Sequence, residues 1–199
     1  MYVHVKIDYG SGMLFVTFLK KKSQAIEDGI QFIKTLIKLN KMPKYIRMDQ
    51  SGENKKMKKI INQSYPGIHF EMTARDTPQQ NGKIERAIAT IWDSVRATMN
   101  SSGLNTHEKN KMWGEAFKFC VDWWNSSTID EAKETPEEIW NGSNPKWIKQ
   151  LKEFGEVGII KKIGKQGKLD DKGIDGVMVG YEKECEAGTY RMWNLKRND

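Results

Sequence analysis

Two acidic residues stand where a chain can present carboxylates to a metal ion. Asp49 ends a short, mostly apolar run, and the polar turn 50–53 follows it. Glu85 lies early in a predicted helix, and the thirty-five residues 50–84 separate it from Asp49. Strand ends and helix starts of α/β folds face the same crevice, so these carboxylates can converge on one hard cation such as Mg²⁺. The plain alternative is that Asp49 begins a turn and Glu85 complements the positive end of a helix.

The elements that must position these two residues alternate between strand and helix. Apolar alternation and short apolar runs predict strands over 3–7, 13–19, 45–49 and 68–72, while helical spacing of apolar residues predicts helices over 23–40 and 53–64. A polar loop, 77–82, opens a third helix that Gly103 closes. The first two strands predict a hairpin at the antiparallel edge of an otherwise parallel sheet. The predicted fold class is therefore α/β.

The second half of the chain changes character after Pro145. Helices are predicted around the tryptophans at 113, 123 and 124, whose helical spacing favours a core role, and from Thr135-Pro136 onward. Three strand-like runs, 157–162, 176–181 and 189–193, are punctuated by glycines and predict a small all-β module. We therefore predict two domains, 1–150 and 151–199.

Charge and composition limit the class of protein. Thirty-three Lys and Arg against 26 Asp and Glu give a net charge of +7, which favours a polyanionic partner such as nucleic acid. Charged residues interrupt every apolar stretch and no secretory signal is visible, so we expect an intracellular protein with no membrane-spanning segment. Two cysteines and three histidines make neither a disulfide framework nor a Cys/His zinc cluster.

Two stretches carry a family resemblance, RMDQSGE over residues 47–53 and TPQQNGKIER over residues 77–86. With the interval between the two acids, they resemble the integrase core of retroelements, most closely that of Ty1/copia-group Pol polyproteins. Residues 168–172 and 180–181 resemble the SH3-like module that follows this core. The resemblance implies an RNase H-like mixed sheet flanked by helices, with a small SH3-like β-module behind it.

The resemblance also implies an activity, which is DNA integration by a Mg²⁺-dependent polynucleotidyl transferase and endonuclease. Members of the family trim element DNA ends and join them to target DNA, using an Asp, Asp, Glu site that holds two Mg²⁺ ions. Asp49 matches the second of these carboxylates and Glu85 the third, so both are expected to be catalytic and metal-binding. The family acts on double-stranded DNA as multimers, which implies a location in the nucleus or in a cytoplasmic particle.

One departure from the family pattern affects the chemistry. The family's first carboxylate lies on a strand upstream of the hairpin, where this sequence begins, so we expect an N-terminally truncated core. Asp8 matches a different acidic residue, and we expect it to start the turn at Tyr9-Gly10. In the family the first carboxylate bridges both ions, so we expect this fragment alone to bind them poorly. Two functions stay open, an integrase fragment and a catalytically dead nucleic-acid-binding remnant, and whether this chain is itself an enzyme stays open with them.

Residues near Glu85 suit contacts with DNA. Gln79, Gln80 and Asn81 present side-chain amides in the predicted loop, which suits phosphates and base edges. Lys83 and Arg86 are expected in the first helical turn, where opposing the macrodipole by ~0.5 kcal/mol favours a phosphate partner. Two lysine groups are equally compatible with a solvated face and with backbone contacts. They are 55, 56, 58 and 59, and 161, 162, 165 and 168.

Overall fold

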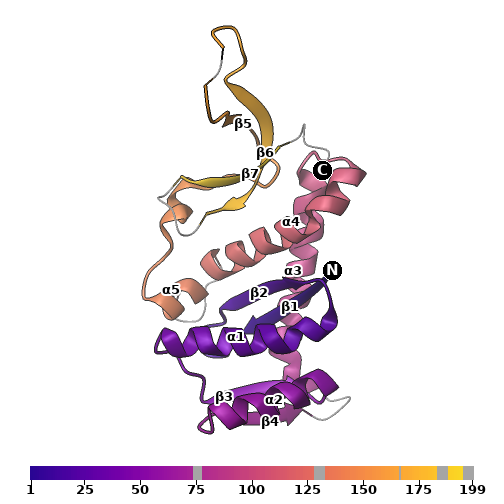
Figure 1. Cartoon of the computed structure of the whole chain (residues 1–199), viewed down its shortest axis with the longest axis vertical. Helices are drawn as coiled ribbons and strands as arrows, with labels where there is room; N and C mark the ends of the chain where they lie inside the picture. Colours follow the sequence, from indigo (N-terminus) through magenta and orange to yellow (C-terminus); the bar gives the residue numbers. More distant parts are fainter. Residues whose placement is uncertain (74–77, 128–132, 166, 183–187, 195–199) are drawn as a thin grey trace. The chain divides into compact units, whose positions relative to one another are not determined.

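The computed structural model describes residues 1–73, 78–127, 133–165, 167–182 and 188–194 (Figure 1). Its elements, in chain order, are β1 (Tyr2–Ile7), β2 (Leu14–Leu19), η1 (Lys22–Gln24), α1 (Ala25–Lys38), β3 (Tyr45–Asp49), α2 (Gly52–Ser64), β4 (His69–Thr73), α3 (Pro78–Ser101), α4 (Thr106–Ser127), α5 (Pro136–Asn141), η2 (Lys146–Gln150), β5 (Val157–Lys161), β6 (Gly173–Tyr181) and β7 (Tyr190–Asn194). This order confirms the α/β prediction.

The chain divides into two compact units. The first consists of residues 1–6 and 16–88, and the second of 7–15 and 89–199. The predicted domain boundary at residue 150 falls inside the second unit, directly after η2, and the division into two domains at that point stays a prediction.

The core of the first unit lies where α1 and α2 pack against the β3–β4 pair. Strand alternation turns Met48 inward, where it contacts Ile33, Met57 and Ile61 of the two helices. Helix α1 approaches α2 closely because Gly29 is buried against Met57; a side chain at residue 29 would overlap the sulfur of Met57. The same alternation turns Asp49 to the exposed face of β3.

Backbone hydrogen bonds join the strands of the first unit in two pairs. β1 pairs with β2, and β3 pairs with β4 in parallel, with Tyr45 opposite His69 and Asp49 opposite Thr73. Among the described residues no ladder joins the two pairs.

The second unit contains the predicted all-β module. β5, β6 and β7 form an antiparallel sheet in that order (Figure 1). β6 is buried from Val177 to Tyr181, and Tyr181 stacks on Trp147 with ring centroids 4.2 Å apart. α4 reaches the same cluster through Phe119, 5.9 Å from the Tyr181 ring. The three-stranded antiparallel sheet is therefore confirmed, and its finer likeness to an SH3 fold stays a prediction.

Candidate metal site and nucleic-acid interface

Asp49 is held by the start of α2. Its Oδ1 accepts hydrogen bonds from the backbone N–H of Ser51 at 3.0 Å and from Nδ2 of Asn54 at 2.7 Å. Ser51 is also the N-cap of α2, since its Oγ accepts from the N–H of Asn54 at 3.3 Å. The start of α2 therefore fixes the position of the Asp49 carboxylate.

The pKa of the Asp49 carboxyl lies below its ordinary value. Partial burial acts to raise this pKa, but the hydrogen bonds from Ser51 and Asn54 and the positive charge of Lys22 outweigh it. Asp49 is therefore ionised at neutral pH, and it is exposed at the end of its strand.

α3 is tied to the same edge of the β3–β4 pair. Thr73, the register partner of Asp49, is buried, and its Oγ1 accepts a hydrogen bond from Nδ2 of Asn81 at 3.2 Å. The Thr73 hydroxyl in turn donates to the carbonyl oxygen of Met48 at 3.4 Å. Glu85 follows Asn81 by four residues, so it lies on the same side of α3, about 6 Å further along the helix axis. The structure thus places Glu85 one helical turn beyond the contact that joins α3 to the strand edge.

Comparisons with known proteins identify the family. Over 191 residues the chain is 32% identical to the "Retrovirus-related Pol polyprotein from transposon TNT 1-94" of Nicotiana tabacum, covering 94% of this chain and 14% of the polyprotein. The solved HTLV-2 integrase catalytic core domain, a trimeric form in complex with magnesium, matches with a TM-score of 0.50 and 20% identity over 69% of this chain and 82% of that chain. The chain is an integrase catalytic-core homologue.

The chain also matches a component of a solved retroviral assembly. A chain of the simian T-cell lymphotropic virus intasome, solved with PP2A regulatory subunit B56 gamma, matches with a TM-score of 0.53 and 14% identity over 98% of this chain and 70% of that chain. At such identities the solved structures show the integrase-core fold alone. No family model matches the sequence. The integrase-core homologue spans 14% of the length of the polyprotein that it resembles.

The residues predicted to contact DNA all lie in α3 of this integrase-core homologue. The helix begins at Pro78, so the predicted loop is wrong for residues 78–82, and residue 77 lies outside the described residues. Asn81 is helical and bound to Thr73, while the side chains of Gln79 and Gln80 are outside the description. Proline suits the first helical position, and the Asn81 contact offsets the poor helix propensity of Asn and Gly.

We predicted Lys83 and Arg86 in the first turn of this helix. That prediction is wrong, because α3 already begins at Pro78. They stand six and nine positions into the helix. Because the macrodipole acts mainly within the first turn, the argument from an unfavourable placement does not hold for them. The Arg86 guanidinium lies back over Gly82, where a Cβ would come within 3.6 Å of it. Contacts of all five residues with DNA stay predictions.

Asp8 forms the turn that was expected of it. Its Oδ2 accepts hydrogen bonds from both the N–H and the Oγ of Ser11, each at 2.7 Å. Its backbone N–H donates to the carbonyl oxygen of Met13 at 2.9 Å, which closes the hairpin between β1 and β2. The Asp8 carboxylate is therefore used within the turn.

The donor set of the candidate site fits a hard cation. Mg²⁺ in proteins is commonly held by one or two carboxylates, with waters and substrate phosphates completing its shell. Asp49 and Glu85 are both exposed carboxylates, and the lowered pKa of Asp49 provides the ionised form that a cation needs. Within the described ranges no three His, Cys, Asp or Glu residues group to hold a metal. The chemistry of these two donors suits a hard cation.

The sequence analysis missed three residues that shape this site: Ser51, Asn54 and Thr73. Ser51 carries a usable signal, because a serine directly before a helix is a typical N-cap. Thr73 carries none, since its contacts with Met48 and Asn81 depend on how strand and helix pack.

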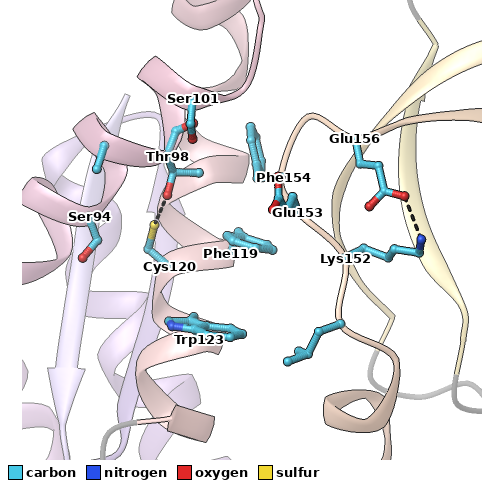
Figure 2. A pocket seen from close by; sticks show the side chains of 12 residues that line it. Ser94, Thr98, Ser101, Phe119, Cys120, Trp123, Lys152, Glu153, Phe154 and Glu156 are labelled. Carbon is cyan, nitrogen blue, oxygen red and sulfur yellow. Dashed lines mark hydrogen bonds and ion pairs between the residues drawn. The ribbon is translucent and has the colours of Figure 1, made fainter.

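A cavity of about 810 Å³ in the second unit is separate from the two acids (Figure 2). It lies between α3, α4 and the segment 151–156, and Phe119 and Trp123 line it. Burial raises the pKa of the Cys120 thiol on its wall, which keeps the thiol protonated. At the other side Glu156 is paired with Lys152 at 2.7 Å. Asp49 and Glu85 do not line this cavity.

The described residues include no helix of the length and apolar character needed to cross a membrane.

Proposed function

We propose that this integrase-core homologue supplies two carboxylates, Asp49 and Glu85, to a Mg²⁺-dependent site that cleaves element DNA ends and joins them to target DNA. The observation that supports it most is the contact of α3 with Thr73, which stands opposite Asp49 in the β3–β4 pair. Thr73 is the register partner of Asp49 and accepts from Asn81, and Glu85 follows one helical turn later.

Each residue of the site has its own part in this proposal. Asp49 offers its carboxylate to the ion, and the hydrogen bonds from Ser51 and Asn54 hold that carboxylate in place. Glu85 offers the second carboxylate, and Asn81 sets its distance from the strand edge by binding Thr73. When bound, Mg²⁺ lowers the pKa of the attacking oxygen and stabilises charge on the scissile phosphate.

We expect the chain alone to hold the ion without completing the reaction. Family members use a third carboxylate that bridges two ions, and this sequence supplies only the counterparts of the other two. Two ions, formally +4, would face two carboxylates and one phosphate, which weakens both affinity and geometry. Purified chain that joined model element ends to target DNA in Mg²⁺ would contradict this expectation.

Calorimetric titration with Mg²⁺ tests the two acids. Asp49→Asn and Glu85→Gln should each weaken binding at least ~10-fold, since even the partners behind metal ligands are worth that much. Glu27→Gln, which removes an exposed acid from the first turn of α1, is the matched control and should bind like the unmodified chain. Equal affinities across all four proteins would overturn the metal site.

The second candidate function is DNA binding without chemistry. The absence of a three-ligand metal group from the described residues favours it. The same titration separates the two candidates, because a remnant of this kind binds duplex DNA and shows no Mg²⁺ affinity that depends on Asp49 or Glu85.

A further inference from the structure

The cavity between α3, α4 and the segment 151–156 has the size and the walls of a small-molecule site. Its volume of about 810 Å³ lies within the range of about 300–1,000 Å³ that is typical of such sites. Phe119 packs edge-on against Phe154 with ring centroids 5.5 Å apart, so an apolar wall runs from α4 to the segment. Trp123 and Leu151 also line the cavity, and each of them is 45% exposed. These exposed side chains can cover the apolar part of a ligand.

The α3 wall of the cavity presents hydrogen-bond acceptors. The hydroxyl of Ser94 donates to the carbonyl oxygen of Thr90 at 2.9 Å, and the hydroxyl of Ser101 donates to the carbonyl oxygen of Thr98 at 3.1 Å. Because a hydroxyl has one proton and two lone pairs, both oxygens can still accept a hydrogen bond, but their protons are already used. This wall therefore favours a ligand that donates hydrogen bonds.

The opposite wall carries a carboxylate that has no cationic partner among the described residues. Lys152 and Glu156 pair with each other at 2.7 Å, whereas none of the ion pairs in the described part of the chain includes Glu153. Figure 2 shows Glu153 beside Phe154, on the side of the segment that faces the helices, while the Lys152–Glu156 pair lies on its other side. One lysine and two glutamates line the cavity, so its wall is net negative although the whole chain carries +7.

We propose that this cavity binds a small organic cation, an amine carried on an aromatic or aliphatic body. The ammonium group binds Glu153, and the body packs against Phe119 and Trp123. An ammonium group has three protons and no lone pair, which suits a wall of acceptors, and the ring of Trp123 attracts a cation through its face. An anionic ligand is disfavoured, because Lys152, the one cation among the described side chains of the wall, is already paired with Glu156.

A matched series of three ligands tests the proposal. Phenylbutylamine, phenylbutanol and phenylbutyrate share one apolar body and differ in the charge of the end group. Their binding to the unmodified full chain is followed at pH 7 by two-dimensional proton–nitrogen NMR. The indole N–H signal of Trp123 serves as a reporter at the cavity, since Trp123 lines it.

The amine should bind at least ~5-fold more tightly than the alcohol, because hydrogen bonds to charged groups are about twice as strong as those between neutral groups. The carboxylate should bind most weakly, although a net charge of +7 on its own favours the anion. The signals that shift should be those of α3, α4 and the segment 151–156. The proposal would be overturned if the carboxylate bound as tightly as the amine, if the amine did not bind, or if the shifts were confined to other parts of the chain.

Variants of Glu153 test where the cation lies. Glu153→Gln should abolish the ~5-fold preference for the amine, and Glu153→Lys should reverse it, so that the carboxylate binds more tightly than the amine. Glu27→Gln, which removes an exposed acid from α1, is the matched control and should keep the preference. A Glu153→Gln protein that still preferred the amine would contradict the proposal. Because Glu153 is exposed, both of its variants should fold, and the same NMR spectra show whether they do.

A variant of Trp123 tests the apolar wall. Trp123→Ala should weaken the binding of the amine and of the alcohol alike, since it removes a ring that both bodies contact, while Trp123→Phe should keep most of the affinity. Unchanged binding in Trp123→Ala would overturn the placement of the ligand. The ligand series contains neither DNA nor Mg²⁺, and Asp49 and Glu85 do not line the cavity, so its outcome is independent of the proposed function.

Discussion

Replacing Asn125 should destabilise the second unit strongly, because this side chain takes the place of a neighbouring strand at the start of β2. Its Oδ1 accepts from the backbone N–H of Leu14 and its Nδ2 donates to the carbonyl oxygen of Leu14, each at 2.8 Å. Asn125 is only 1% exposed and Leu14 only 2%. One buried side-chain amide therefore pairs with both backbone groups of Leu14.

The size of the effect follows from the two bonds. Asn125→Ala leaves two buried backbone groups unpaired, at about 1–3 kcal/mol each, or about 2–6 kcal/mol in total. A domain holds only about 5–15 kcal/mol of stability, so this loss is a large share. For a chain of this size each kcal/mol moves Tm by about 2–4 °C, so we expect a fall of at least ~4 °C.

Thermal unfolding followed by circular dichroism measures the effect, with Asn110→Ala on the exposed side of α4 as the control. Asn125→Asp separates hydrogen bonding from volume, because it keeps the size and the acceptor but cannot donate to Leu14. We expect it to be at least as destabilising as alanine, while Asn110→Ala stays near the unmodified chain. An Asn125→Asp protein whose Tm lies within ~1 °C of the unmodified chain would refute the reasoning.

Two more predictions concern single side chains. Burial and the charge of Lys6 hold the pKa of His4 below its usual value, despite the 2.6 Å contact with Asp28. Below about pH 6.5 the imidazole of His4 therefore binds a proton more readily in the unfolded chain than in the folded chain. Stability should fall with pH from that value downward, and His4→Gln should flatten the fall in Tm between pH 7 and 5; an unchanged pH profile would contradict this. Tyr181→Phe removes a hydroxyl that donates to the carbonyl oxygen of Lys152 at 2.9 Å and accepts from its N–H at 3.0 Å. We expect this variant to lower the free energy of unfolding by about 1–3 kcal/mol in a urea titration. A loss below ~0.5 kcal/mol would show that the two hydrogen bonds between Tyr181 and Lys152 do not stabilise the fold.

Local patterns predicted the elements that carry the candidate site. The short run 45–49 predicts a strand that ends at Asp49, and β3 has these bounds. The same kind of reasoning was wrong at 78–82, where the polar residues favour a loop but the Asn81 contact with Thr73 supports a helix.

Other features had no local signal at all. Asn125 and Leu14 are 111 residues apart, and the sequence around neither residue predicts that the two form hydrogen bonds. Which strands pair with one another could not be predicted from the sequence either. Alternation indicates the two faces of a strand, but it does not indicate which strand lies beside it. What the sequence predicted best was therefore the type and direction of each element, and what it missed was the set of neutral side chains that hold elements together.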